Sequence, residues 1–414
     1  MLKIKDFYLN CVNLCLSQFG INLEENSNKQ HIWIAYSGGV DSRVLLELAS
    51  LAFRDKLNYK LIAIHINHGI NDKADFWEQH CYETCKSLSI ELHVEKLKIN
   101  DAEVKQFGLE AALREHRLAI WPKLLCKEDV LFLAHHLNDQ IETVFLRLLR
   151  GTGVQGLAGI KMANILNNVK CVRPLLHNTR EEILNFANQN KLNYIEDDSN
   201  LDLKFSRNFL RHAILPKFYQ YWPKFLYNIN RALDHLQQTD LYINNQVEQA
   251  LLNCYAYNVC YNKNHINKYH NILSISKLLT QNKFLQPQIL RKFIVNQGLK
   301  PPAKAQIDRI FLEIINARID AQPKLKCGKY FILKYRDKLY VYLATDFLQQ
   351  KNDIKNKIGN LMFVSGKYLN AISSDKAKKI FQKHAIPPWD RRSYSLVFLD
   401  NKLITIVGLW SKGL

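Results

Sequence analysis

The 414-residue sequence predicts an α/β fold whose mostly parallel sheet is covered by helices on both faces. Short apolar runs alternate with longer segments of helical pattern in the first half of the chain, as is typical of such sheets. The runs lie at residues 32–36, 61–66, 91–94 and 130–134, and helices are expected around 75–88 and 109–125. Ligands bind at the carboxyl ends of the strands in sheets of this kind, so we expect the functional residues there.

The character of the sequence changes near Pro216, after which helical spacing predicts a mainly helical middle domain. A further helix is expected at 307–315, and two apolar runs at 330–335 and 339–342 predict a terminal β-hairpin. A lysine-rich segment at 346–358 is interpreted as a linker. The small α+β unit after it contains an expected helix at 375–384 and a hairpin around Asp400 and Asn401. The predicted domains are 1–216, 217–345 and 359–414.

The most informative motif is the hexapeptide at residues 37–42, which follows the first apolar run directly. A strand that turns through glycines into a helix directs bare N–H groups and the positive helix end at one point, which suits an anion. A carboxylate at such a site needs a cation between itself and a phosphate, so Asp41 is predicted to be a Mg²⁺ ligand. The residues expected at the nucleotide phosphates are Ser37, Gly38, Gly39, Val40, Asp41 and Ser42. The alternative is an ordinary tight turn, since glycine–serine turns are common. The spacing is not that of a Walker loop, which needs a Lys-Ser/Thr pair after its glycines.

The net charge of +19 at pH 7 favours a polyanionic partner, either nucleic acid or an anionic membrane face. A membrane is the weaker alternative because no apolar run approaches the roughly 18 residues that span a bilayer, and no signal-peptide pattern opens the chain. A lysine-rich surface without such a partner is the third alternative. The nine cysteines are scattered and contain no Cys-x-x-Cys pair. They predict a reducing, cytoplasmic location and no bound metal except Mg²⁺.

Two further segments place charged residues at helical spacing. Asp139 and Glu142 share one face near an expected helix N-terminus, where they bind a cationic amine or Mg²⁺, or simply complement the helix dipole. Glu110, Arg114 and Arg117 form a stripe that is either functional or a solvated face with an ion pair. The glycine-rich residues 151–156 are interpreted as a helix C-cap or as part of an active-site rim.

Together these segments resemble the bacterial tRNA(Ile)-lysidine synthetase family, a branch of the PP-loop ATP pyrophosphatases with the signature Ser-Gly-Gly-x-Asp-Ser. The resemblance covers nearly the whole chain and rests on an ordered set of motifs rather than on any one of them. The motifs after the hexapeptide lie at 65–69, 110–117, 135–143, 150–157, 173–176, 196–211 and 386–391.

The resemblance implies a PP-loop nucleotide-binding fold and a ligase that acts on the CAU anticodon of tRNA(Ile). ATP adenylates O2 of the wobble cytidine with loss of pyrophosphate, and the amino group of L-lysine then expels AMP, so that the tRNA reads AUA codons. The tRNA partner also accounts for the basic excess, because an anticodon arm is a dense array of phosphates. The middle and terminal domains are expected to bind tRNA. Tyr219, Tyr221 and Tyr227 are candidates for stacking on bases, and the alternative, favoured for most of them, is a core or interface position. A homodimer is left open.

Residue by residue, the resemblance implies the following roles. Backbone near Ala63 to His65 frames the adenine, and Asp41 holds Mg²⁺. Catalytic and lysine-binding roles fall on Arg114, Asp139 and Glu142, with Asp41 also catalytic, while Arg207 and Arg211 lie near the site and on the tRNA-facing loop.

One position departs from the family pattern, which commonly has two adjacent aspartates where this chain has Asn138-Asp139. The change puts any metal-binding role of position 138 in doubt, and Asn138 could instead be a helix N-cap. Three other functions stay open. They are a PP-loop tRNA thiolase, which normally needs catalytic cysteines or a cluster, a small-molecule amide synthetase, which has no need of so basic a surface, and a non-catalytic tRNA-binding protein with a nucleotide pocket.

Overall fold

The computed structural model divides the chain into two compact units, residues 1–240 and 241–414, which are described separately. It describes residues 2–21, 30–67, 69, 73–97, 108–196, 202–256, 272–318, 321, 323–343, 356–358, 361–365, 375–391, 394–399, 402–406 and 409–411. None of the helices in these ranges is long and apolar enough to cross a membrane.

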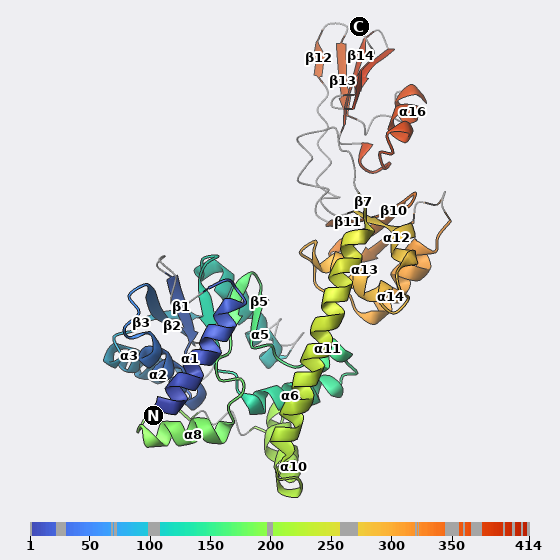
Figure 1. The fold of residues 1–414 in the computed structure, drawn as a ribbon. Helices are drawn as coiled ribbons and strands as arrows, with labels where there is room; N and C mark the ends of the chain where they lie inside the picture. Colours follow the sequence, from blue (N-terminus) through green and yellow to red (C-terminus); the bar gives the residue numbers. More distant parts are fainter. Residues whose placement is uncertain are drawn as a thin grey trace. The chain divides into compact units, whose positions relative to one another are not determined.

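A six-stranded sheet with the order β3-β2-β1-β4-β6-β5 forms the centre of the first unit (Figure 1). Its first five strands in this order pair in parallel, and β5 pairs with β6 in antiparallel fashion. The strands are β1 (Gln30–Ala35), β2 (Tyr59–Asn67), β3 (Glu91–Lys96), β4 (Val130–Phe132), β5 (Ala163–Leu166) and β6 (Val169–Val172). The predicted mostly parallel sheet is confirmed.

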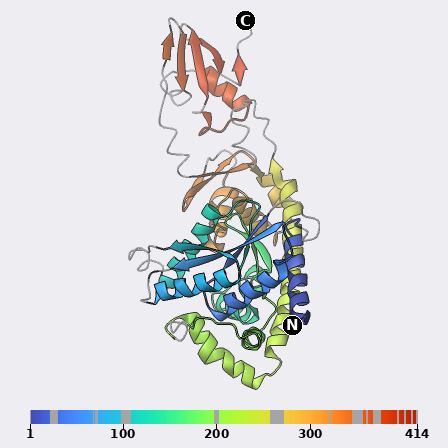
Figure 2. The same ribbon diagram turned by 90° about the vertical axis from the view of Figure 1, so that its left-hand side faces the viewer.

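Helices cover both faces of this sheet, as the sequence predicts (Figures 1 and 2). The helices α1 (Leu2–Ser17), α2 (Val40–Phe53), α3 (Ala74–Ser87) and α8 (Arg180–Gln189) pack on one face, and α5 (Leu109–Leu124) packs on the other. Alternate side chains of β1 enter opposite cores, because successive residues of a strand point to opposite faces. Ile32 and Ile34 face the α2 side, whereas Trp33 packs with Trp121 of α5.

The cysteines at helical spacing lie deeper than the half-buried positions that the sequence indicates. Cys11, Cys15, Cys81 and Cys85 are all buried, at 7% exposure or less. Burial raises the pKa of the Cys15, Cys81 and Cys85 thiols to about 12, so these side chains stay protonated at neutral pH. They serve as small apolar core residues.

The segments after β4 complete the first unit. They are α6 (Leu137–Leu148), α7 (Val154–Leu157), α9 (Ser206–Phe209), the π-helix η2 (Leu210–Ile214), α10 (Leu215–Tyr221) and the start of α11 (Phe225–Cys254). A small apolar cluster joins Leu137 and Ile141 of α6 to Leu210, Leu215 and Phe225. This cluster holds the π-helix against α6 and so fixes which polar side chains meet above it. The C-cap of α6 is Leu149, and Gly151, two residues beyond it, has a φ of +69°, a left-handed conformation that glycine adopts without strain.

The second unit contains the end of α11 and a five-stranded antiparallel sheet of order β7-β8-β11-β10-β9, and both pack with four further helical segments. The strands are β7 (Tyr255–Ala256), β8 (Ile272–Ser274), β9 (Lys324–Cys327), β10 (Tyr330–Tyr335) and β11 (Lys338–Leu343). The helical segments are α12 (Ile275–Thr280), α13 (Gln286–Val295), α14 (Lys304–Arg309) and the π-helix η4 (Ile310–Ile315). The predicted helix and hairpin are confirmed. The other strands have four residues or fewer, too few for a clear alternating pattern.

A second antiparallel sheet, of order β12-β13-β14-β15-β16, forms the carboxyl-terminal part. Its elements are β12 (Asn356–Ile358), β13 (Leu361–Ser365), α16 (Asp375–Lys383), β14 (Ser395–Leu399), β15 (Lys402–Ile406) and β16 (Trp410–Ser411). The expected helix and the strands of the final hairpin are confirmed, whereas its turn at 400–401 lies outside the described residues. The linker interpretation is wrong for residues 356–358, which form β12, and residues 346–355 are not described.

Candidate active site

The hexapeptide forms the tight connection between β1 and α2 that the sequence predicts. Gly39 is the N-cap of α2, and the first helical hydrogen bond runs from the Arg43 N–H to its carbonyl. The hydroxyl of Ser42 accepts from the Ser37 N–H at 3.2 Å and lies 3.1 Å from the Ser37 hydroxyl. The N–H groups of the first helical turn have no partner within the helix, so the loop presents donors of the kind that bind a phosphate.

Glycine is required at position 38 for two separate reasons. Its φ of +87° lies in the left-handed region, and a Cβ there would lie 2.5 Å from Cδ1 of Ile195. Ile195 also donates its backbone N–H to the Gly38 carbonyl at 2.9 Å, so the close approach is part of the loop's support.

We therefore expect Gly38→Ala to destabilise the first unit by about 2–3 kcal/mol, the sum of backbone strain and a clash with Ile195. Gly20→Ala is the matched control, because Gly20 has a φ of +72° but a Cβ added there would meet no atom within 4 Å. Strain alone should reduce its stability by about 1 kcal/mol. Urea unfolding of the two variants measures the difference, and equal losses would show that the contact with Ile195 is unimportant.

His136 lies between the hexapeptide at 37–42, which we call the phosphate loop, and Asp139, which with Glu142 forms the acidic pair. It is the N-cap of α6, where its Nδ1 accepts from the Asp139 N–H, so that Nε2 carries the proton of the neutral ring. That Nε2 lies 3.7 Å from Oδ2 of Asp41 and 3.4 Å from Oδ2 of Asp139, and the His136 side chain is 1% exposed. One buried imidazole therefore faces both carboxylates.

Asp41 is held in an environment that disfavours its charge. Burial raises its pKa, and the neighbouring His136 and Arg180 only partly offset that effect. Its Oδ1 is buried and has no hydrogen-bond partner among the described residues. A buried, unsatisfied carboxylate oxygen next to a phosphate-binding turn fits a Mg²⁺ ligand, because Mg²⁺ is bound through one or two carboxylates together with substrate phosphates.

Asp139 and Glu142 lie on one face of α6 and form a cluster with two arginines, which we call the carboxylate–arginine cluster. Arg207 donates from Nε to Glu142 at 2.6 Å and from Nη2 to Asp139 at 2.9 Å. Arg211 donates from Nε to Glu142 at 2.6 Å and from Nη2 to Asp139 at 3.2 Å. The Glu142 side chain is only 1% exposed, whereas the two arginines are 27% and 22% exposed. Two guanidinium groups thus neutralise two carboxylates at the floor of the site.

Asp139 and the two arginines of the cluster stay charged at neutral pH. Burial raises the pKa of Asp139, but His136 and Arg207 outweigh it and hold that pKa below its usual value. Burial lowers the pKa of Arg207 and Arg211, while the carboxylates raise it by more. The site therefore contains the ionised carboxylate of Asp139, which suits an ammonium group, and guanidinium groups that suit a carboxylate or a phosphate.

Three family models match successive parts of the chain. A PP-loop domain model matches residues 15–218, the TilS substrate binding domain matches 273–340, and the TilS substrate C-terminal domain matches 369–413. The tRNA(Ile)-lysidine synthase of Haemophilus influenzae strain PittEE is 31% identical over 93% of this chain and 96% of its own length. The chain belongs to the tRNA(Ile)-lysidine synthase family.

A second relative agrees with this membership. The tRNA(Ile)-lysidine synthase of Buchnera aphidicola subsp. Schizaphis graminum is 32% identical over 92% of this chain and 90% of its own length. Among solved structures, the U34-tRNA thiolase NcsA from Methanococcus maripaludis matches 57% of this chain and 78% of its own, with 21% identity and a TM-score of 0.44. As a member of the tRNA(Ile)-lysidine synthase family, the chain is an ATP-dependent ligase that modifies tRNA.

The remaining residues expected from the tRNA(Ile)-lysidine synthase family are distributed as follows. Ala63 is fully buried in the middle of β2, and His65, 5% exposed, lies near the strand's carboxyl end. Burial lowers the pKa of His65, whose Nδ1 lies 3.0 Å from the Tyr36 carbonyl oxygen. Arg114 lies in α5, but its side chain is outside the described part of the structure. The adenine and Arg114 assignments stay predictions.

The prediction that Asn138 is a helix N-cap is wrong, because α6 begins at Leu137 and His136 takes that position. Asn138 is instead the second residue of the helix. Its Oδ1 accepts from the Arg180 N–H at 2.9 Å and its Nδ2 donates to the Tyr219 hydroxyl at 3.3 Å. It therefore joins α6 to the start of α8 and to α10.

Two residues of this site, His136 and Arg180, were not predicted as site residues from the sequence or from its resemblance to the tRNA(Ile)-lysidine synthase family. Arg180 is the first residue of α8 and lies near enough to Asp41 to lower its pKa. The capping box formed by Thr179 and Glu182 could have located this helix start from the sequence alone. Nothing in the sequence indicates that the helix start lies beside the phosphate loop.

Proposed function

We propose that this site carries out both steps of lysidine synthesis on the wobble cytidine of tRNA(Ile) with the CAU anticodon. In the first step cytidine O2 attacks the α-phosphorus of ATP and pyrophosphate leaves. In the second step the amino group of lysine attacks C2, and the C2–O2 bond breaks to release AMP. The observation that carries the proposal is the position of His136, which places Asp41 of the phosphate loop beside Asp139 of the acidic pair.

The phosphate loop, residues 37–42, binds the triphosphate through the first-turn N–H groups of α2 and the hydroxyls of Ser37 and Ser42. Asp41 holds Mg²⁺, and its orphaned Oδ1 supports this role. Mg²⁺ bound there supplies positive charge that offsets the charge of the phosphates. Arg180 and Arg211 add positive charge near the same carboxylate, as the pKa of Asp41 indicates.

Asp139 and Glu142 bind the amino group of lysine, and Arg114 binds its carboxylate. The acids already hold Arg207 and Arg211, so lysine competes with two side chains of the same charge. Both arginines belong to the segment 203–233, which contains six Lys or Arg and no Asp or Glu. Phosphates of the tRNA provide the alternative anionic partner. Binding of tRNA therefore draws the arginines away and frees the acids for lysine.

This competition predicts that Arg211→Gln strengthens the binding of lysine to the enzyme without tRNA by about fivefold or more, because a competing cation is removed. Calorimetric titration with lysine measures the effect. Arg231→Gln removes a charge from the same segment outside the cluster and should leave lysine affinity unchanged. Weaker lysine binding by the Arg211 variant would show that this arginine assists lysine directly.

The wider chain fits a tRNA partner. The domains at 217–345 and 359–414 bind the tRNA body, and a cytoplasmic location follows from that substrate. The thiolase alternative is disfavoured because seven of the eight cysteines in the described ranges are buried. Such thiols are poor candidates for catalytic nucleophiles.

The proposed function is tested by incubating the full chain with ATP, Mg²⁺, radiolabelled lysine and a tRNA(Ile) transcript bearing CAU. Label should enter this transcript and not the elongator tRNA(Met), which has the same anticodon. If no label enters tRNA under any condition, the proposed function is wrong. Label in tRNA(Met) would contradict the inferred discrimination.

A further inference from the structure

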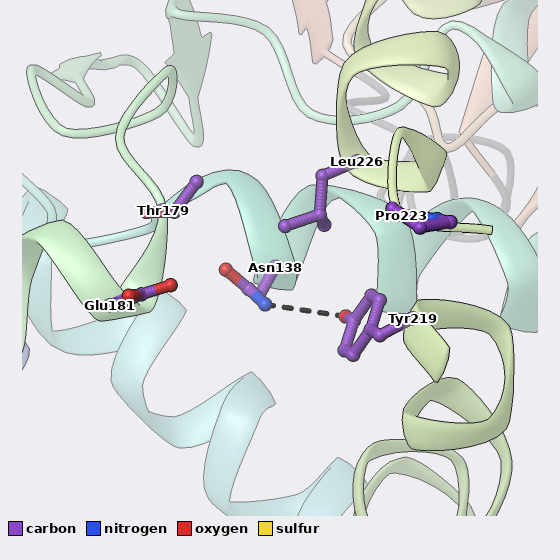
Figure 3. Close-up of a pocket in the computed structure, with 6 residues that line it drawn as sticks. All are labelled: Asn138, Thr179, Glu181, Tyr219, Pro223 and Leu226. Carbon is purple, nitrogen blue, oxygen red and sulfur yellow. Dashed lines mark hydrogen bonds between the residues drawn. The ribbon is translucent and has the colours of Figure 1, made fainter. Parts of the chain in front are cut away.

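A cavity of about 310 Å³ opens beside the active site in the first unit. Figure 3 shows its lining, with Glu181 and Tyr219 on opposite sides of Asn138. The lining residues come from α6, the start of α8, α10 and the start of α11, and they are Asn138, Thr179, Glu181, Tyr219, Pro223 and Leu226. None of them belongs to the phosphate loop or to the carboxylate–arginine cluster, so the cavity is not explained by ATP or by the lysine site.

The walls of this cavity combine a flat apolar part with a polar edge. Leu226, Pro223 and the ring of Tyr219 provide the apolar part, and Tyr219 is held by an edge contact with Phe225 at 5.7 Å between ring centroids. The Asn138 amide is fixed in orientation because it donates to the Tyr219 hydroxyl and accepts from the Arg180 N–H. A planar group that stacks on apolar and aromatic side chains and hydrogen-bonds along one edge matches such a site.

The surroundings favour a part of a polyanion. Asn138 directly precedes Asp139 of the carboxylate–arginine cluster, so the cavity lies next to the site where the wobble base must react. Three basic residues lie within two positions of the lining in sequence, namely Arg180, Lys217 and Lys224, and both lysines are exposed. Phosphates on either side of an inserted base would meet positive charge here.

Free lysine fits this cavity poorly. Glu181 is the single charged residue among the six that line the cavity, so an ammonium group of lysine would find a partner there but its carboxylate would find no cation. The apolar wall of Pro223 and Leu226 offers no partner to that carboxylate. A nucleobase carries no such charge, and a carboxylate at its edge accepts a hydrogen bond from an exocyclic amino group.

We propose that this cavity binds one unpaired base of the anticodon loop other than the wobble cytidine, and that this base carries an exocyclic amino group read by Glu181. The inference rests on the proposed function, because it takes the tRNA(Ile) anticodon arm as the ligand. The enzyme then binds two bases of the loop at the same time: this base stacks in the cavity, and the wobble cytidine lies at the adenylation site. The cavity thereby contributes to the choice of tRNA.

The test uses a larger side chain to fill the cavity and then identifies the base that can no longer bind there. Leu226→Trp should weaken binding of the intact tRNA(Ile) transcript by about tenfold, the loss expected when one stacked base is excluded. Asn228→Trp is the matched control, since Asn228 is exposed and two residues on, which places it on the other side of α11. Transcripts lacking a single base at each anticodon-loop position are then bound to both variants and to the unmodified chain. For the unmodified chain, removal of the base that occupies the cavity should lower tRNA affinity. For the Leu226 variant, removal of that same base should lower it no further, because the tryptophan already excludes the base.

Equal, additive losses at every position would overturn the proposal, as would a loss of lysine affinity with unchanged tRNA affinity. Because the tryptophan could impair folding, Glu181→Gln provides an independent readout at an exposed side chain. The unmodified chain should prefer an amino-bearing base at the mapped position, and this variant should lose that preference. Retained preference would also overturn the proposal.

These binding measurements need neither ATP nor lysine, so they are separate from the test of the proposed function. A chain that shows the single-position pattern but incorporates no lysine would contradict the function and keep the base site. A chain that incorporates lysine without the pattern would contradict the base site alone.

Discussion

Replacing Asp41 with Asn is expected to lower the rate of adenylation at least about a hundredfold while leaving tRNA affinity nearly unchanged. The amide keeps the shape of the side chain but removes the negative charge that makes it a Mg²⁺ ligand. The Asp41 carboxylate is half-buried at the first turn of α2, within the phosphate loop, so a separate tRNA surface should not depend on it. Release of pyrophosphate in the presence of tRNA and the absence of lysine measures this step directly.

A matched control is available on the same helix. Glu47→Gln also removes one carboxylate from α2, but Glu47 pairs with Arg43 at 2.8 Å and lies outside the hexapeptide. Its effect on adenylation should be small, since Glu47 lies outside the phosphate loop, whereas loss of its pair with the buried Arg43 lowers the stability of the chain. If Asp41→Asn adenylates tRNA as fast as Glu47→Gln, the phosphate-loop assignment of Asp41 is incorrect.

Replacing Glu142 with Gln is expected to separate the two chemical steps. The amide has no charge to offer the amino group of lysine, so lysine transfer should slow about a hundredfold while adenylation proceeds and adenylated tRNA accumulates. Single-turnover measurement of both products gives the ratio of the two rates. The ratio of the lysine-transfer rate to the adenylation rate does not depend on how much of the variant is folded, because a smaller folded fraction lowers both rates equally.

The same substitution should also reduce stability. Glu142 is buried and accepts from both Arg207 and Arg211, so the variant leaves two partly buried guanidinium groups without their main partner. We expect the free energy of unfolding to fall by about 1–3 kcal/mol. This is less than for a fully buried ion pair, because the two arginines are partly exposed. Glu128→Gln, which breaks an exposed pair with Lys170, should lose under about 1 kcal/mol. If both rates of the Glu142 variant fall by the same factor, the lysine-binding role is wrong.

The parts of the site that are local in sequence could be predicted from it. The hexapeptide specifies its own turn, because Gly38 and Gly39 permit the backbone path and the apolar runs on either side specify a strand and a helix. The shared face of Asp139 and Glu142 follows from helix geometry alone. The β10–β11 hairpin likewise follows from two apolar runs that are adjacent in the sequence.

The contacts that complete the site depend on tertiary packing and could not be predicted. Arg207 is 65 residues from Glu142 in the chain, and the apolar cluster between α6 and the π-helix brings the two together. His136 faces two carboxylates only because α2 and α6 begin at the same edge of the sheet. The error at Asn138 has a local cause. Asparagine is a favoured N-cap, but the histidine two residues earlier takes that position.

The central claim is that one site first adenylates the wobble cytidine and then passes it to lysine. The most direct measurement is a chase experiment with the full chain, α-labelled ATP and tRNA(Ile) transcript. Without lysine, labelled AMP should become attached to the tRNA, and added lysine should convert that tRNA to the lysidine form with release of an equal amount of AMP. Lysidine formation with no AMP-bearing tRNA on the way, or AMP-bearing tRNA that lysine cannot convert, would contradict the account.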